Sequence, residues 1–183
     1  MLVSRSQATL LVVDVQEKLI TAMTDPEGTV KRTEWLLRVC RELEIPVVFS
    51  EQYPKGLGAT LQQLTDAAGD SLTVEKVHFS CVSAECLPED LLAREQVILC
   101  GIETHVCVLQ TALELLARGK QVFVVEDATD CRSTYSHELG IQRMRDAGAQ
   151  IVTREMVVFE SLQSASHEKF RAISKAFLIG EQP

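Results

Sequence analysis

The sequence predicts an α/β fold: one domain over residues 1–183, built as three layers, with helices on both faces of a six-stranded parallel sheet. Short apolar runs rich in β-branched residues alternate with helical patterns along the chain, and no repeat or low-complexity linker interrupts them. Parallel strands need long crossover connections, which helices supply. A chain of 183 residues with 46% hydrophobic content can fill one such core. We therefore expect a Rossmann-like sheet in a single domain.

The predicted strands are the apolar runs. A parallel sheet is buried on both faces, so its strands appear as nearly continuous apolar runs and not as alternating apolar and polar residues. Asp14 interrupts the first run, which favours a strand over a secretory signal. The runs cover residues 9–13, 46–49, 71–74, 96–100, 121–125 and 150–152.

Helical patterns fill the intervals between these strands. Gly119 and Gly148 follow two of the helices, and Pro46 restarts the chain after the first long one. The last helix has more apolar residues than a solvent-facing terminal helix requires, which predicts a homo-oligomer, a dimer or tetramer or a larger assembly. The predicted helices cover residues 29–44, 59–68, 84–93, 104–118, 134–147 and 163–177.

Charge and cysteine content narrow the functional class. A net charge of −8 argues against a nucleic-acid partner and against an anionic membrane surface, and no apolar run is long enough to span a bilayer. Six irregularly spaced cysteines favour free thiols in a reducing, cytoplasmic setting. A zinc site at His78, Cys81 and Cys86 is the alternative use of three of these groups. No second Cys pair completes a tetrahedron, so we expect no metal and no cofactor.

In an open parallel sheet, ligands bind beyond the carboxyl ends of the strands. The residues that follow the apolar runs are therefore the candidates for a functional site. They include a carboxylate, an ammonium group and a thiol, at Asp14, Gln16, Ser50, Glu51, Lys76, the turn 103–107, Glu126, Asp127 and Asp130.

Cys107 lies where an apolar run ends at Gly101 and a helical pattern begins. The first N–H groups of a helix lack intrahelical partners, and the helix dipole there favours a thiolate and a developing oxyanion. Thr104 would cap this helix. The alternative is that Cys107 is a small buried apolar residue, which is the common fate of a free cysteine.

Three segments together are similar to the signature segments of the isochorismatase-like cysteine hydrolases: LLVVDVQ (10–16), VEKVHFSCV (74–82) and GIETHVCVLQTALEL (101–115). EQYPKGLG (51–58), VVEDATDCRS (124–133) and EMVVFE (155–160) resemble the isochorismatase domain-containing subgroup, whose substrate is usually unassigned. The resemblance covers nearly the whole chain and implies the isochorismatase-like hydrolase fold. Its activity would be hydrolysis of a small-molecule amide or a related C–N or acyl bond.

The resemblance implies a catalytic triad of Asp14, Lys76 and Cys107. Cys107 would attack a carbonyl carbon, and Asp14 would accept the thiol proton and later protonate the leaving group. Lys76 would stabilise the thiolate. Backbone N–H groups of Val106 and Cys107 would hold the oxyanion. The family commonly has a non-proline cis peptide before the nucleophile, which here would join Ile102 and Glu103.

Other activities of the family fit less well. Its nicotinamidases bind a metal through an Asp and two His after the second strand, but the segment FSEQYPKGLGAT (49–60) contains no histidine. True isochorismatases cleave a vinyl ether without a nucleophilic Cys, so Cys107 favours acyl hydrolysis. Vinyl ether hydrolysis, a non-catalytic scaffold and a redox sensor remain alternatives. A small, partly planar substrate would contact Gln16, Glu51, Tyr53, Phe79 and His105.

Overall fold

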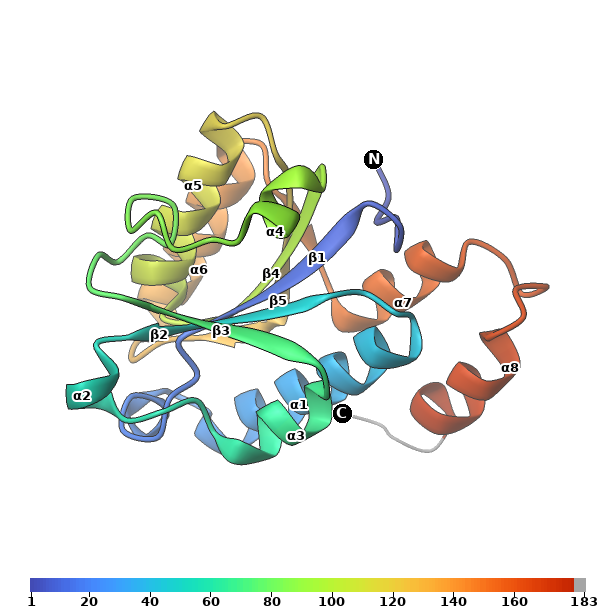
Figure 1. Ribbon diagram of the computed structural model, residues 1–183, viewed down its shortest axis with the longest axis horizontal. Helices are drawn as coiled ribbons and strands as arrows, with labels where there is room; N and C mark the ends of the chain where they lie inside the picture. Colours follow the sequence, from blue (N-terminus) through green and yellow to red (C-terminus); the bar gives the residue numbers. More distant parts are fainter. Residues whose placement is uncertain (180–183) are drawn as a thin grey trace.

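The computed structural model describes residues 1–179 and has a six-stranded, all-parallel sheet at its centre (Figure 1). The strand order is β3-β2-β1-β4-β5-β6, and helices cover both faces, as predicted. The strands are β1 (Ala8–Val13), β2 (Val47–Gln52), β3 (Ser71–Lys76), β4 (Gln96–Ile102), β5 (Gln121–Asp130) and β6 (Gln150–Val152).

The strand order reverses at β1, and this positions the site. On one side, β1 pairs with β2, the next strand in the sequence. On the other side it pairs with β4, in register from Ala8 with Gln96 to Val13 with Gly101. All six residues of β1 are buried because both faces are covered. The crevice beyond the carboxyl ends of β1 and β4 is the expected binding place in such a sheet.

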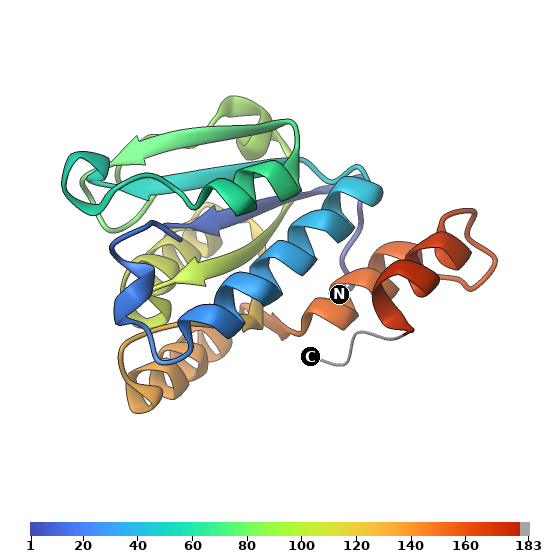
Figure 2. The same ribbon diagram turned by 90° about the horizontal axis from the view of Figure 1, so that it is seen from below.

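Two groups of helices cover the two faces, as Figure 2 shows for the lower face. The first face carries α1 (Pro26–Glu42), α3 (Gln62–Ala68), α7 (Arg154–Leu162) and α8 (Phe170–Ile173). The second carries α4 (Glu89–Ala93), α5 (Leu109–Ala117) and α6 (Thr134–Asp146). The short elements are η1 (Ile20–Ala22), α2 (Pro54–Leu57), the π-helix η2 (Thr104–Val108) and a second π-helix, η3 (Ser174–Leu178).

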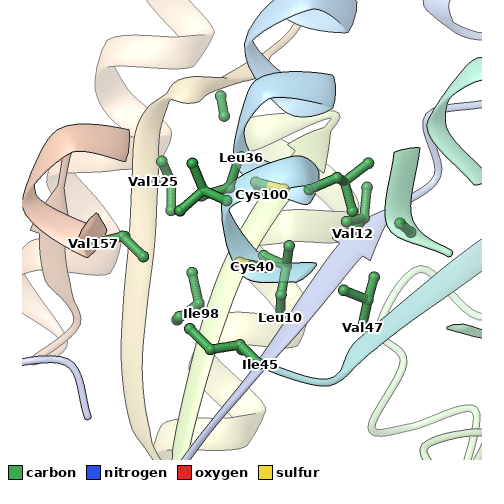
Figure 3. Packing of buried hydrophobic residues seen from close by; sticks show 14 of the residues in the cluster. Leu10, Val12, Leu36, Cys40, Ile45, Val47, Ile98, Cys100, Val125 and Val157 are labelled. Atoms are coloured by element: carbon green, nitrogen blue, oxygen red, sulfur yellow. The ribbon is translucent and has the colours of Figure 1, made fainter. Parts of the chain in front are cut away.

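Alternate residues of β1 point into two separate cores. Leu10 and Val12 pack with Leu36 and Cys40 of α1 and with Ile98 of β4 (Figure 3). Burial raises the pKa of the Cys40 thiol to about 12, so this cysteine behaves as a small apolar core residue. The opposite core, under α5 and α6, contains Leu11 and Val13 of β1 and includes the candidate nucleophile Cys107.

Two helix predictions were wrong. The predicted helix 84–93 is helical only over Glu89–Ala93, because a tight turn occupies the residues before it. Helix α7 (Arg154–Leu162) was missed, and the predicted helix 163–177 begins where α7 ends. Gln163 is left-handed, with φ of 60°, and terminates α7. Between there and residue 179, only Phe170–Ile173 and the π-helix after it are helical.

The apolar residues of this last segment pack on the chain's own core, which removes the reason for assigning them to a subunit interface. Ile173 is buried, and Phe177 contacts the edge of Trp35 with ring centroids 5.8 Å apart. Homo-oligomer formation stays a prediction. Within residues 1–179, no helix has the length and hydrophobicity needed to cross a lipid bilayer.

Candidate active site

Three strands bring Asp14, Lys76 and Cys107 together. Asp14 follows β1 in a left-handed conformation, with φ of 55°, Lys76 is the last residue of β3, and Cys107 lies in η2 directly after β4. Lys76 Nζ donates to Asp14 Oδ2 at 2.7 Å, and both side chains act on the pKa of the Cys107 thiol. The three groups named from the sequence therefore form one contiguous cluster.

Two further side chains hold the charged pair in place. Ser50 Oγ, on β2, donates to Asp14 Oδ1 at 2.6 Å, and Lys76 Nζ also donates to Gln52 Oε1 at 2.7 Å. Ser50 stood among the residues expected at this edge, whereas Gln52 did not. No motif distinguishes Gln52 in the sequence; only the register that pairs it with Lys76 across β2 and β3 identifies it.

Burial and charge act in opposite directions on this pair. Burial raises the pKa of Asp14, and the Lys76 charge and the bonds from Lys76, Ser50 and Cys107 offset only part of the increase. Burial alone would lower the pKa of Lys76, but the charge of Asp14 and the hydrogen bond with it oppose burial, and overall that pKa is raised. The short contact supports an ion pair, with Asp14 readier to accept a proton than an ordinary carboxylate.

The thiol of Cys107 is protonated in this state, which corrects the expected bias towards thiolate. Burial raises its pKa to about 12, with the Asp14 charge adding to the increase and Lys76 opposing it. Burial and a carboxylate partner are not visible in a helix-start motif. The arrangement instead matches a neutral nucleophile whose proton passes to a neighbouring base during attack.

Gly101 allows β4 to approach β1 closely enough to bring the nucleophile over Asp14. Its φ is 111°, and a Cβ there would lie 2.1 Å from the carbonyl oxygen of Val13. After it, the Ile102–Glu103 peptide bond is cis, at the position that the resemblance implies. The Glu103 carboxylate accepts from the Arg132 side chain at 2.8 Å, which ties this turn to the end of β5.

Thr104 does not cap the helix. Its hydroxyl donates to the Asp130 carbonyl at 3.0 Å and lies 2.9 Å from His137 Nδ1. Asp130 belongs to β5, which continues past a register shift to pair with the last residues of β4. The hydroxyl therefore joins the nucleophile turn to β5 instead of satisfying the first N–H groups of η2.

One of the two predicted oxyanion donors already has an acceptor. The Val106 N–H donates to the Glu103 carbonyl at 3.0 Å, and the Val108 N–H donates to the same oxygen at 3.2 Å. An oxyanion would have to displace Glu103 to reach Val106. The Cys107 N–H remains our candidate donor at this position.

The expected substrate-contacting residues separate into two groups. Gln16 is fully buried, and its amide bonds with backbone groups of Gln52 and Gly58, so it braces the β2 loop rather than lining a pocket. Glu51 is also buried and accepts from the Thr60 N–H at 2.7 Å. By contrast, Tyr53 and Phe79 are more than half exposed.

His105 lies next to the nucleophile and is partly buried. Its Nδ1 is buried without a hydrogen-bond partner, and its backbone packs against Gly140 of α6. Among residues 1–179, no group of three or more His, Cys, Asp or Glu side chains has an arrangement suited to a metal ion.

Residues 8–156 match the isochorismatase domain, and the chain belongs to this family. It is 40% identical over 169 residues to isochorismatase domain-containing protein 2A of Mus musculus, covering 91% of this chain and 80% of the relative. It is 35% identical over 172 residues to the secreted isochorismatase effector Isc1 of Phytophthora sojae, covering 91% and 82%. The structure of MAR1 ribonuclease from Caenorhabditis elegans superposes with a TM-score of 0.92 at 35% identity, covering 100% of this chain and 95% of that one.

Proposed function

We propose that this protein is a cysteine hydrolase that cleaves a small amide, carbamate, urea or related acyl compound. The observation that supports the proposal is the buried ion pair of Asp14 and Lys76, whose two side chains both act on the pKa of the buried Cys107 thiol. A scaffold would have no use for this cluster, because burying two charges costs free energy that apolar residues would not.

In the proposed reaction, Cys107 sulfur attacks the carbonyl carbon while its proton passes to Asp14. The oxyanion accepts from the Cys107 N–H, and Asp14 protonates the leaving nitrogen as the tetrahedral intermediate collapses to a thioester. Water then attacks the thioester with Asp14 as base, and the acid leaves with the thiol restored. Lys76 stays charged throughout and stabilises the negative charge, whether Asp14 or Cys107 carries it.

Two features support a small substrate. Asp14 and the Lys76 side chain are fully buried, and Cys107 is only 5% exposed, so little space surrounds the nucleophile. Tyr53 and Phe79 are the exposed candidates to contact a planar group as it enters. Two cavities, one of about 620 Å³ beside Arg5 and one of about 520 Å³ beside Arg38, are lined by other residues.

The test is turnover of a panel of small amides, carbamates and ureas by the wild-type protein, Cys107→Ser and Cys86→Ser. We expect hydrolysis and a trapped acyl adduct on Cys107 in the wild type, loss of both in Cys107→Ser, and retention in the Cys86→Ser control. Hydrolysis that survives in Cys107→Ser would overturn the assignment of Cys107 as the nucleophile. The panel also includes isochorismate, which tests the alternative of vinyl ether hydrolysis.

The name of the nematode relative includes a ribonuclease activity, so RNA is the second substrate to test. The net charge of −8 opposes binding to a polyanion, and a thiol-acyl mechanism has no role for a phosphodiester. We expect no RNA cleavage above that of Cys107→Ser. Cleavage that co-purifies with the protein and depends on Lys76 or Asp14 would replace the acyl hydrolase proposal.

A further inference from the structure

The turn after β3 has a defined geometry that brings Cys81 and Cys86 together. Ser80 Oγ accepts from the Val82 N–H at 3.0 Å, and one helical turn follows. The turn closes with two hydrogen bonds, from the Glu85 N–H to Val82 at 3.1 Å and from the Cys86 N–H to Cys81 at 3.4 Å. Glu85 is left-handed, with φ of 52°. This pair of bonds around a left-handed residue is the Schellman motif.

A Schellman motif normally brings an apolar residue after the turn onto one in its last helical turn. Here the two positions are occupied by Cys86 and Cys81. Cys86 Sγ donates to the Cys81 carbonyl at 3.4 Å, and each thiol shifts the pKa of the other. The backbone motif and the side-chain bond thus both place the Cys86 sulfur beside Cys81.

The two thiols differ in exposure and in proton affinity. Cys81 is fully buried, and Cys86 is partly exposed. The interaction with Cys86, with burial, raises the pKa of Cys81, whereas the interaction with Cys81 lowers the pKa of Cys86. An oxidant arriving from solvent therefore meets Cys86 first and in its more reactive form.

Cys81 also interacts with the side chains that surround Asp14. Its pKa responds to Ser50, which donates to Asp14, and to the Lys76 charge. Its backbone N–H donates to Thr111 Oγ1 of α5 at 3.1 Å, so the turn is fixed to the helix that follows the nucleophile. A change at the Cys81 sulfur reaches Asp14 through a single hydroxyl group.

We propose that Cys86 and Cys81 form a redox site in which a hydroperoxide oxidises Cys86 and Cys81 resolves the product as a disulfide. The Cys86 thiolate attacks the peroxide oxygen, which gives the sulfenic acid and releases water or alcohol. The Cys81 thiol then attacks the Cys86 sulfur, so that an S–S bond forms, the S–O bond breaks and water leaves. In total, two thiols lose two hydrogens and one hydroperoxide is reduced. This chemistry stands whether or not the triad hydrolyses an amide.

The experiment treats the reduced, full-length protein with one equivalent of hydrogen peroxide, blocks free thiols and cleaves the chain after Glu85. This cleavage puts Cys81 and Cys86 on separate peptides, which stay joined only through a disulfide. We expect the joined pair in the wild type, none in Cys86→Ser, and a dimedone-trapped sulfenic acid on Cys86 in Cys81→Ala. Buried Cys40 is the internal control and should stay reduced.

Oxidation of Cys107 or Cys131 ahead of Cys86, or a Cys86 sulfenic acid that accumulates equally with and without Cys81, would overturn the redox site. A second measurement tests its link to the triad: the pH midpoint of Cys107 alkylation should shift when the wild type is oxidised and return with a reductant. Cys86→Ser should show no shift. An unchanged midpoint in the oxidised wild type would refute the link through Ser50, although the disulfide site itself would stand.

Discussion

Lys76 Nζ lies 2.7 Å from Asp14 Oδ2, and both side chains are completely shielded from solvent. The two residues come from the ends of β3 and β1, with β2 between them in the sheet. A buried charge is tolerable only while its partner remains, because desolvation is compensated by the partner's charge and hydrogen bonds. Each residue therefore stabilises the fold only in the presence of the other.

A double-mutant cycle measures this dependence. Lys76→Met leaves the Asp14 carboxylate buried without its partner and should reduce the free energy of unfolding by about 3–5 kcal/mol. Adding Asp14→Asn to Lys76→Met should recover a large part of that loss, because no unpaired charge remains. Urea denaturation of the four proteins gives the coupling energy. Additive losses would show that the two side chains act independently.

The pKa of Cys107 should fall in Asp14→Asn. The Asp14 charge contributes to raising that pKa, so its removal makes the thiolate easier to form, whereas Lys76→Met removes an opposing charge and should raise the pKa. The rate of iodoacetamide alkylation against pH, read by peptide mass spectrometry, gives both values. A rise in Asp14→Asn would contradict the assignment of charges in the cluster.

In Asp14→Asn, the rate of hydrolysis should fall although the Cys107 thiol becomes more acidic. Asp14→Asn cannot accept the thiol proton or protonate the leaving group, so its turnover of a substrate found in the panel should drop by about 10²–10⁴-fold. The combination of a more acidic Cys107 and a slower enzyme identifies Asp14 as the acid and base. A fast Asp14→Asn enzyme would assign proton transfer to another group.

Gly101→Ala should be strongly destabilising. Residue 101 has φ of 111°, and the added Cβ would meet the Val13 backbone oxygen at 2.1 Å, so about 1–3 kcal/mol of backbone strain combines with about 1–3 kcal/mol of overpacking. Gly148→Ala is the matched control, because its φ is 104° and nothing lies within 4 Å of the added atom. Equal losses in thermal denaturation of the two variants would exclude the close approach of β4 to β1 as a constraint.

The Asp130 carboxylate should stabilise the protein in a pH-dependent way. Burial alone would raise its pKa, but bonds from the Thr24 and Thr29 hydroxyls and two backbone N–H groups lower it overall. A lowered pKa contributes stability that is complete above the unfolded value of about 3.9 and is lost as the pH falls through the folded value.

Asp130→Asn should therefore cost about 1–3 kcal/mol at pH 7, since four donors lose a charged acceptor. The difference from wild type should shrink between about pH 4 and pH 2. Exposed Asp70→Asn should stay within about 0.5 kcal/mol throughout. A constant difference for Asp130→Asn in urea unfolding across this range would mean that the carboxylate charge has no part in the effect.

The centre of the sheet was predictable because β1, β2 and β4 are buried almost throughout and therefore appear as apolar runs, whereas the edge strand β3 is largely exposed. Helix α7 was not, because its residues 154–162 mix buried Val157 and Val158 with exposed Met156 and Phe159, so no clear apolar face marks it. The last two residues of β5 are polar, and their pairing with the end of β4 depends on a register shift that only the assembled sheet defines.

The clustering of Asp14, Lys76 and Cys107 was predictable because strand ends and signature segments mark all three in the sequence. The partners that hold them were harder to find: Gln52 carries no motif and reaches Lys76 only through strand register. Gln16 looked like a pocket residue because it follows β1, but it bonds to the neighbouring loop backbone. The protonation of Cys107 depends on burial, which a motif does not reveal.

The strand order also has a consequence for synthesis on the ribosome. Ala8 of β1 pairs with Gln96 of β4, so the central strand of the sheet has only one of its neighbours until about half of the chain has emerged. Until then one edge of this apolar strand has no hydrogen-bonding partner, and such an edge favours association between nascent chains. Sequence changes that slow the emergence of β4 should therefore lower the yield of soluble protein without altering the stability of the molecules that fold.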